Sequence, residues 1–555
     1  MTFSFVKRLL SRLQPKDRRI WFLLLGASLT GGLSRSIFLA TINAAISARA
    51  DGSMLVLYDV AAASLIAFMI WSDYFSAVRG RLLSEGLAIR MRAHVAAEIG
   101  QANLRFVERE TVSGLHYHLM NTVSIVTESY LTLLTFSSAA VALIFNILYV
   151  GWLSPISLAV GLVVTILGIA VDVRFERTNL EQRKQLDSLR RQSHGAHHAL
   201  LQGYKELRIS GDKMADYRQR VAALHQDLLD ATVKVARVSA SGLAATDFFQ
   251  YSAITVIGLG LPFVAVLEPI TVMQLLAALL FTIGPVNTAV STFGTFGRAQ
   301  LGLDNLEKLS HAVEQTGEKL PAECRATLPP FETIELRNLS MRFDEAGEGA
   351  EDFQLGPVDL TIRRGDVVCI SGGNGSGKSV LMRLLTGLYQ PNGGEIRYNG
   401  VTLTREARQA YREQFTTVFN DFFLFKELLG RRATAAAIGQ KWLSHFGLAG
   451  KTRYADGAFS TIDLSTGQRK RLALTVSVLD ECPILVLDEF AAELDSKNRD
   501  RFYRIWLPEL RKIGKTVVIV SHDDEYFDVA DILVRMDLGK VVMCTMPARQ
   551  GTMPA

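Results

Sequence analysis

Long apolar stretches alternate with charged ones along the first part of the chain. Six of them hold apolar residues over roughly 20 positions, the length that a helix needs to cross a bilayer. We place them at Ile20–Ile46, Leu55–Phe75, Tyr130–Trp152, Pro155–Val173, Leu243–Leu267 and Ile270–Phe293. The pattern predicts an all-α transmembrane domain with six spans over residues 1–315.

Lys and Arg are distributed unevenly between the segments that flank these stretches. They gather before the first span and within Arg79–Arg109 and Arg174–Arg237, whereas the turns near Leu153 and Glu268 have none. Cytoplasmic flanks carry this excess of basic residues. We therefore expect a multi-pass protein of the inner (plasma) membrane with both termini in the cytoplasm. Continued helical periodicity predicts that the helices extend into the cytosol and reverse near Asn103–Leu115 and Gly203–Lys213.

Arg35 lies in the middle of the first predicted span. A buried arginine there costs roughly 2.5–3.5 kcal/mol on insertion scales unless it faces protein or water. We therefore predict that Arg35 lines a substrate cavity. Asp59 and Asp73 lie toward the two ends of the second span, where each either reaches the interface or lines the cavity. Three amides either line the cavity or form hydrogen bonds between helices, namely Asn146, Gln274 and Asn287.

The composition changes after Gln315. Residues 316–330 are polar and contain proline, which predicts a linker, and residues 331–555 alternate short Val/Ile-rich strands with helices. The second domain is therefore expected to be α/β. Hydrophobic residues make up 49% of the chain and charged residues 21%, with a formal net charge of +5. This modest charge is explained by the basic flanks of the spans, and we expect no nucleic acid partner.

A complete phosphate-binding loop opens the α/β domain. The apolar run DVVCIS predicts a buried strand before it, and SVLMRLLTGL predicts a helix after it. Backbone N–H groups of such a loop surround the phosphates of a nucleotide, at the positive end of a helix dipole. Lys378 is expected to reach the β- and γ-phosphates, and Ser379 to bind Mg²⁺. The predicted ATP-binding residues of this loop are Gly372, Gly373, Asn374, Gly375, Ser376, Gly377, Lys378 and Ser379.

Two adjacent carboxylates follow a second apolar strand in the segment ILVLDE. Ligand-binding residues of α/β domains gather at the carboxyl ends of such strands. We expect Asp488 to hold Mg²⁺ through water and Glu489 to act as the general base for ATP hydrolysis. The alternative is that these two carboxylates only end a strand and have no catalytic role. The intact phosphate loop argues against this alternative.

The segment Leu464–Gln468, LSTGQ, resembles the LSGGQ signature of the ATP-binding cassette (ABC) proteins, and it precedes the acidic pair as in that family. The resemblance implies that Ser465, Gly467 and Gln468 cap an ATP molecule held by the phosphate loop of a partner subunit. Thr466 departs from the signature by replacing its first glycine.

The same resemblance assigns several other residues. His522 after the strand TVVIV matches the switch histidine, which we count with Glu489 as catalytic. Asp495 matches the D-loop, and Phe343 matches the aromatic residue that stacks on adenine. Asn420 in VFNDFFLF takes the place of the usual glutamine that reaches the ATP and its metal. Asparagine is one methylene shorter, which is expected to slow turnover without removing it.

Three segments indicate a branch of the family. VFNDFFLF, DEFAAELD and GYKELRI resemble the exporters of cyclic peptides and siderophores, among them the pyoverdine, syringomycin and microcin exporters. This resemblance implies a half-transporter that works with a second one, most simply as a homodimer. The expected function is ATP-driven export of a cyclic or modified peptide, a siderophore or its precursor. Export of lipids or drugs is the alternative, and a membrane ATPase that regulates a partner without transport is a further one.

Overall fold

The computed structural model describes residues 2–11, 14–50, 56–110, 112–264, 268–316, 328–343, 353–430 and 436–545. Most of the predicted linker lies outside these residues. The chain divides into two compact units. The first contains Met1–Ala102 and Phe106–Gly317, and the second contains Glu318–Ala555 together with Asn103–Arg105.

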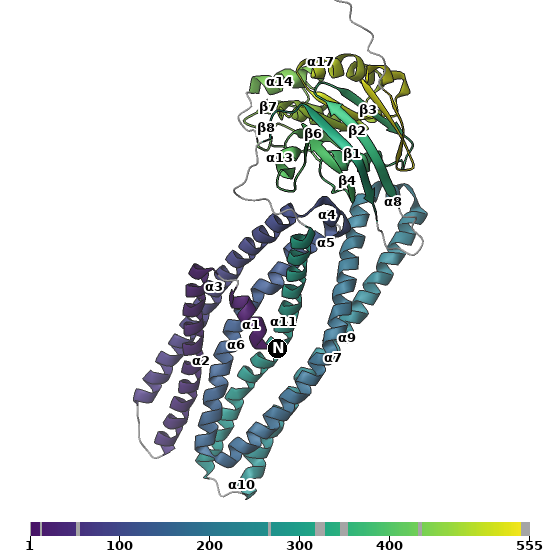
Figure 1. Ribbon diagram of the computed structural model, residues 1–555. Helices are drawn as coiled ribbons and strands as arrows, with labels where there is room; N and C mark the ends of the chain where they lie inside the picture. Colours follow the sequence, from purple (N-terminus) through teal and green to yellow (C-terminus); the bar gives the residue numbers. More distant parts are fainter. Residues whose placement is uncertain are drawn as a thin grey trace, which may run out of the picture. The chain divides into compact units, whose positions relative to one another are not determined.

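The first unit is built from long helices (Figure 1). Six of them are much longer than a membrane span: α2 (Pro15–Ala50), α3 (Val56–Gln101), α6 (Val123–Leu153), α7 (Pro155–Gln202), α9 (Gly211–Thr255) and α11 (Pro269–Thr316). Shorter elements complete the unit: α1 (Thr2–Ser11), α4 (Leu104–Glu110), α5 (Val112–Tyr117), η1 (His118–Thr122), α8 (Tyr204–Ile209), η2 (Val256–Gly260) and α10 (Leu261–Val264). The predicted reversals are confirmed, because α4 and α5 follow the end of α3 and α8 separates α7 from α9.

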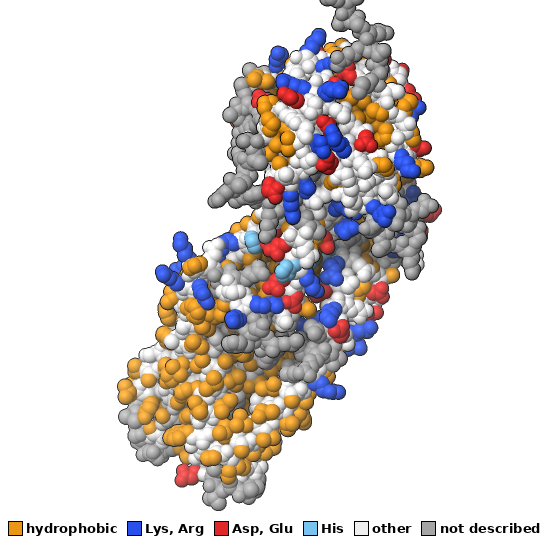
Figure 2. All heavy atoms as spheres, in the orientation of Figure 1, with side chains coloured by type: hydrophobic (Ala, Val, Ile, Leu, Met, Phe, Trp, Pro, Cys, Tyr) orange, Lys and Arg blue, Asp and Glu red, His pale blue; other side chains and the backbone are white. Residues whose placement is uncertain are grey.

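The long helices lie where the six spans are predicted. Four of them, α2, α3, α6 and α11, are long and apolar enough to cross a membrane by length and composition alone. The apolar part of α7 is shorter, Pro155–Val171, and the predicted span at Leu243–Leu267 falls on α9, η2 and α10, with residues 265–267 outside the described ranges. Hydrophobic side chains gather over the end of this unit that lies opposite α4 and α5 (Figure 2).

Close backbone contacts hold α2 against α6 and α3. A Cβ atom at Gly32 would lie 2.3 Å from the backbone oxygen of Ser138, so only glycine permits this approach. Ser72 on α3 donates a hydrogen bond to the backbone oxygen of Ala27 (2.8 Å). Small residues at such contacts allow helices in a membrane to pack closely. The neighbouring polar side chain, that of Arg35, is thereby brought within reach of both α3 and α6.

The second unit is α/β, as predicted, and contains two main sheets. The strands are β1 (Thr333–Arg342), β2 (Gln354–Arg363), β3 (Val367–Gly372), β4 (Gly393–Tyr398), β5 (Val401–Thr402), β6 (Phe415–Val418), β7 (Tyr454–Ala455), β8 (Ala458–Phe459), β9 (Ile484–Asp488), β10 (Thr516–Val520), β11 (Ile532–Asp537) and β12 (Lys540–Thr545). The order in the larger sheet is β12-β11-β3-β10-β9-β6, in which all pairs but β12–β11 are parallel. The antiparallel sheet has the order β2-β1-β4-β5. The short strands β7 and β8 pair with each other.

The central strands of the parallel sheet are buried on both faces, which explains their uninterrupted apolar sequences. Val518 and Val520 of β10 pack into one hydrophobic core, whereas Val517 and Ile519 pack into a second core on the other face. This alternation follows from the two-residue period of a strand. The helices of the unit are α12 (Lys378–Leu385), α13 (Arg408–Arg412), α14 (Ala436–His445), α15 (Thr466–Leu479), α16 (Ser496–Arg501) and α17 (Leu507–Lys512), with η3 (Phe490–Glu493), η4 (Phe502–Trp506) and η5 (Asp524–Val529).

Candidate functional site

The parallel sheet brings four predicted site segments to one edge. The phosphate loop follows β3, the acidic pair ends β9, His522 follows β10, and Asn420 follows β6. These strands are neighbours in the order β3-β10-β9-β6, with Ile370 opposite Val520 and Val520 opposite Asp488. The carboxyl ends of parallel strands meet at the same edge of a sheet, where α/β domains bind their ligands.

The phosphate loop runs from the end of β3 into the first turn of α12. Lys378, the first residue of α12, is 6% exposed, and its ammonium group donates to the backbone oxygens of Gly372 (3.0 Å) and Gly373 (2.9 Å). A Cβ atom at Gly372 would lie 2.3 Å from the backbone oxygen of Met536, so a side chain cannot be accommodated there. The loop therefore holds the lysine in place beside its own backbone, at a helix N-terminus that favours phosphate.

Ser379 and Asp488 form the part of the site that fits a magnesium ion. The Ser379 hydroxyl donates to Oδ2 of Asp488 (3.3 Å), and Oδ1 of Asp488 is buried without a hydrogen-bond partner among the described residues. Burial, followed by the charge of Glu489, raises the pKa of Asp488 above its ordinary value. Hydroxyl and carboxylate oxygens are the ligands that Mg²⁺ prefers. The unpartnered oxygen is therefore suited to a cation or to water bound to one.

Glu489 and His522 lie together at the centre of this edge. Oε1 of Glu489 is 3.4 Å from Nε2 of His522. The backbone of Glu489 adopts a left-handed conformation (φ +47°) and is held on both sides, because its N–H donates to Val520 (3.1 Å) and its carbonyl oxygen accepts from Lys470 (2.8 Å). Such strained conformations cluster at functional sites. The carboxylate is thereby fixed beside an imidazole, an arrangement suited to activating water.

Lys470 is a residue of this site that the sequence did not reveal. It is fully buried on α15, its ammonium lies 3.7 Å from a carboxylate oxygen of Glu493, and burial lowers its pKa. The sequence indicates that Lys470 lies on a helix. It does not indicate that the side chain contacts the backbone of Glu489, which comes nineteen positions later in the chain.

The remaining predicted residues lie on other elements of this unit. Phe343 follows β1 and packs edge-on against Tyr389, with ring centroids 6.0 Å apart. Ser465 precedes α15, and its N–H donates to Oε1 of Gln468 (3.2 Å). The Ser465 side chain is exposed, as are those of Asn420 and Asp495. Asp495 immediately precedes α16 and accepts a hydrogen bond from the N–H of Asn498 (2.9 Å), which lowers the pKa of Asp495. The signature is therefore presented at a surface of this unit.

A hydrogen-bonded network behind His522 is also not evident from the sequence. Tyr503 on the π-helical turn η4 is 2% exposed, and its hydroxyl lies 2.7 Å from Oγ of Ser521 and 2.9 Å from Oδ2 of Asp523. Asp523 also pairs with Arg499 on α16 (3.4 Å). Burial raises the pKa of Tyr503, so the phenol remains a neutral donor. The two residues that flank His522 are thus held by Tyr503.

Replacing Tyr503 by phenylalanine is expected to lower kcat for ATP hydrolysis roughly 5- to 10-fold, because the loss of a buried hydrogen bond leaves the Ser521–Asp523 turn unsupported. The KM for ATP should stay within about twofold, since the phosphate loop is untouched. Tyr526→Phe is the matched control, because its ring stacks on that of Tyr503 at a centroid distance of 4.4 Å. Equal kcat values for Tyr503→Phe and the unmodified protein would contradict the positioning role.

The membrane unit contains a second candidate site around Arg35. The guanidinium group donates to both carboxylate oxygens of Asp73 (2.8 and 2.6 Å) and to Oγ of Ser138 (3.0 Å). These residues line a cavity of about 670 Å³, which also receives side chains from α11, among them Pro285 and Thr288. Of the two positions that the sequence leaves open for Asp73, the structure has the cavity, where Asp73 forms an ion pair with Arg35. The cavity therefore contains polar side chains, and the positive charge of Arg35 is balanced by the carboxylate of Asp73.

The predicted amides each have a defined place. Gln274 donates to Ser47 (2.7 Å), and Asn287 donates to Asp247 (3.1 Å), so both form hydrogen bonds between helices. Asn146 is buried and lines a smaller pocket.

Comparison with known proteins places these features in a family. Residues 355–492 match the model of the ABC transporter ATPase domain. The chain is 29% identical to the ATP-binding protein SyrD of Pseudomonas syringae pv. syringae, over 83% of each chain. It is 24% identical to the ATP-dependent lipid A-core flippase of Ralstonia nicotianae, over 83% of this chain and 79% of the flippase. A solved structure of a bacterial Atm1-family ABC exporter with ATP bound superimposes with a TM-score of 0.80 at 16% identity, covering 96% of this chain and 95% of that one.

The fold and the matched domain define a multi-pass membrane transporter of the ABC class, in which six long helices precede one ATPase domain. The chain contains an ABC transporter domain and has the fold of an ABC exporter, and its ATP hydrolysis is coupled to transport.

Proposed function

We propose that this exporter moves a cyclic or modified peptide, a siderophore or a siderophore precursor out of the cytoplasm across the inner membrane, as a homodimer. The observation that carries the proposal is the membrane cavity at Arg35 and Asp73, in which a balanced ion pair lies among apolar and hydroxyl side chains. The segments VFNDFFLF, DEFAAELD and GYKELRI, which resemble those of peptide and siderophore exporters, support the same cargo class.

The chemistry of the ATP site follows from its geometry. Lys378 binds the β- and γ-phosphates, and the adenine stacks on Phe343. Ser379, Asp488 and Asn420 would hold Mg²⁺, which when bound would neutralise phosphate charge. Glu489 accepts a proton from the attacking water, and His522 orients the γ-phosphate beside it.

A second subunit completes each ATP site. Ser465, Gly467 and Gln468 lie at a surface, which suits them to cap the nucleotide held by the partner's phosphate loop. Closure of the two ATPase domains would then reorient the helices, so that the cavity switches from facing the cytoplasm to facing the outside. The ATPase domain and both termini lie in the cytoplasm in this arrangement.

The cavity lining favours a peptide over a lipid. Hydroxyl groups of Ser76, Thr135 and Thr288 stand beside apolar walls from Leu131 and Pro285. A peptide has many N–H donors and carbonyl acceptors, and it can satisfy such a lining while it also contacts the apolar walls. The Arg35–Asp73 pair removes the preference for anionic cargo that a free arginine would create.

Lipid export is a second candidate, favoured by the similarity to lipid A-core flippases over most of the chain. Cargo-stimulated ATP hydrolysis of the purified full-length protein separates the two. Stimulation by cyclic or linear peptides that saturates at micromolar concentration supports the proposal. Stimulation by lipid A without any effect of peptides would replace it with the lipid candidate.

Replacing Arg35 by leucine is expected to raise the KM for a stimulating peptide roughly 10- to 100-fold, because a hydrogen bond from a charged donor contributes about 1.5–3 kcal/mol. The KM for ATP should not change. Thr30→Val, an exposed position on the same helix, is the matched control. The measurement is ATP hydrolysis against peptide concentration, and an unchanged peptide KM in Arg35→Leu would remove Arg35 from the cargo site.

A further inference from the structure

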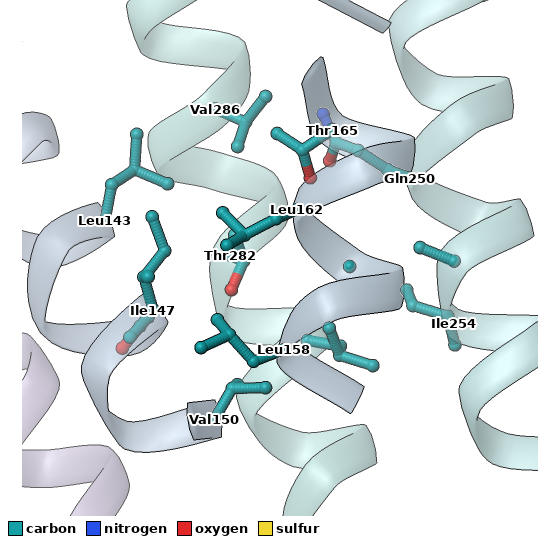
Figure 3. A pocket seen from close by; sticks show the side chains of 14 residues that line it. Leu143, Ile147, Val150, Leu158, Leu162, Thr165, Gln250, Ile254, Thr282 and Val286 are labelled. Atoms are coloured by element: carbon teal, nitrogen blue, oxygen red, sulfur yellow. The ribbon is translucent and has the colours of Figure 1, made fainter. Parts of the chain in front are cut away.

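A second, smaller pocket of about 70 Å³ lies among α6, α7, α9 and α11, apart from the cavity at Arg35 (Figure 3). Most of its walls are apolar, with Leu143 and Ile147 on one side and Leu158 and Leu162 on another. Its polar lining consists of two amides and two hydroxyls, from Asn146, Thr165, Gln250 and Thr282. These groups belong to four different helices.

Two amide oxygens at this pocket lack partners. Oδ1 of Asn146 and Oε1 of Gln250 are buried and find no hydrogen-bond donor among the described residues. The two side chains belong to residues that are 3% and 9% exposed. An unsatisfied buried oxygen is costly and calls for a partner such as a bound molecule.

A chain of hydrogen bonds fixes which end of Gln250 faces the pocket. Oδ1 of Asp247 accepts from Nδ2 of Asn287 (3.1 Å), and Oδ1 of Asn287 accepts from Nε2 of Gln250 (3.2 Å). A carboxylate only accepts hydrogen bonds, so each amide in the chain has one orientation. The Nε2 group of Gln250 donates to Asn287, so the carbonyl oxygen Oε1 of Gln250 is the atom that can accept a hydrogen bond from a bound molecule. The carboxylate of Asp247 thus sets the polarity of a pocket that it does not line.

We infer that this pocket binds the end of a small apolar molecule that carries one O–H or N–H donor, for which an aliphatic alcohol is the simplest representative. The apolar walls match the aliphatic part, and the free oxygens of Asn146 and Gln250 match the donor. The volume is about half that of a cavity known to hold benzene, so only the polar end and a few carbons enter. An occupant bridges the closely packed pair α7 and α9 to the closely packed pair α6 and α11.

Photolabelling of the full-length protein tests the inference without any need for cargo or ATP. The probe is an aliphatic alcohol that carries a diazirine on its chain, and the control probe is its methyl ether, which has the same chain but no donor. In the unmodified protein, the alcohol is expected to label residues of α6, α7, α9 and α11 that line the pocket about tenfold more than the ether does.

Two variants make the result specific. Gln250→Leu removes the acceptor and keeps the apolar volume, so alcohol labelling should fall to the level of the ether. Gly161→Leu fills the pocket from the α7 wall, where a Cβ atom would have only Ile257 within 4 Å, so both probes should label less. An unchanged ATP KM shows that each variant is folded. Equal labelling by the two probes in the unmodified protein, or unchanged alcohol labelling in Gln250→Leu, would overturn the inference.

Discussion

Replacing Glu489 by glutamine is expected to lower kcat for ATP hydrolysis roughly 10²–10⁴-fold, the usual contribution of a general base. Glutamine has the same size, and the backbone of residue 489 is held by Val520 and Lys470 whatever the side chain. The variant should therefore keep the geometry of the site and bind ATP with unchanged affinity. The measurement is phosphate release at saturating ATP.

Glu493→Gln is the matched control for this variant. Glu493 is four residues away and only pairs at 3.7 Å with the buried Lys470, so its kcat should stay within a few fold of the unmodified value. A Glu489→Gln protein that retains more than a tenth of the original kcat would show that another group activates the water.

Replacing Lys378 by alanine is expected to weaken the binding of ATP. The structure holds the ammonium group beside the phosphate loop through the carbonyl oxygens of Gly372 and Gly373. Loss of a charged hydrogen bond to phosphate should weaken ATP binding roughly 10- to 100-fold. Titration with a fluorescent ATP analogue measures this affinity directly.

Lys451→Ala, an exposed lysine of the same unit, should bind the analogue normally. The two lysine variants and the Glu489 variant together separate binding from chemistry, because Lys378→Ala should lose affinity and Glu489→Gln should lose only turnover. Normal affinity in Lys378→Ala would contradict the assigned role of the phosphate loop.

Much of the fold could be predicted because its patterns are local. Apolar runs of membrane length marked the long helices, and short runs of mostly Val, Ile and Leu marked the buried strands β3, β9 and β10. Hydropathy marks the spans at α7 and α9 less clearly, because the apolar part of α7 is short and that of the α9 region ends near residues outside the described ranges. There hydropathy is not sufficient by itself, and the similarity in fold to the exporter structure supports the arrangement of six long helices.

The candidate sites were predictable where a local motif, a family resemblance or a charge within an apolar run marks the residue. In the phosphate loop and in the pair Asp488 and Glu489, the functional residues are neighbours in the sequence. Tyr503 and the Asp247 chain act through residues on other elements, and their roles depend on burial and distance. Asp73 shows the same limit, because its position in the sequence left both the interface and the cavity open, whereas the structure shows it as the ion-pair partner of Arg35.

ATP-dependent uptake of labelled cyclic and linear peptides into inside-out membrane vesicles tests the central claim most directly, with Glu489→Gln as the zero. The proposal predicts uptake that requires ATP, saturates with peptide and vanishes in the variant. An unmodified protein that hydrolyses ATP but accumulates none of these peptides above the level of Glu489→Gln would contradict peptide export.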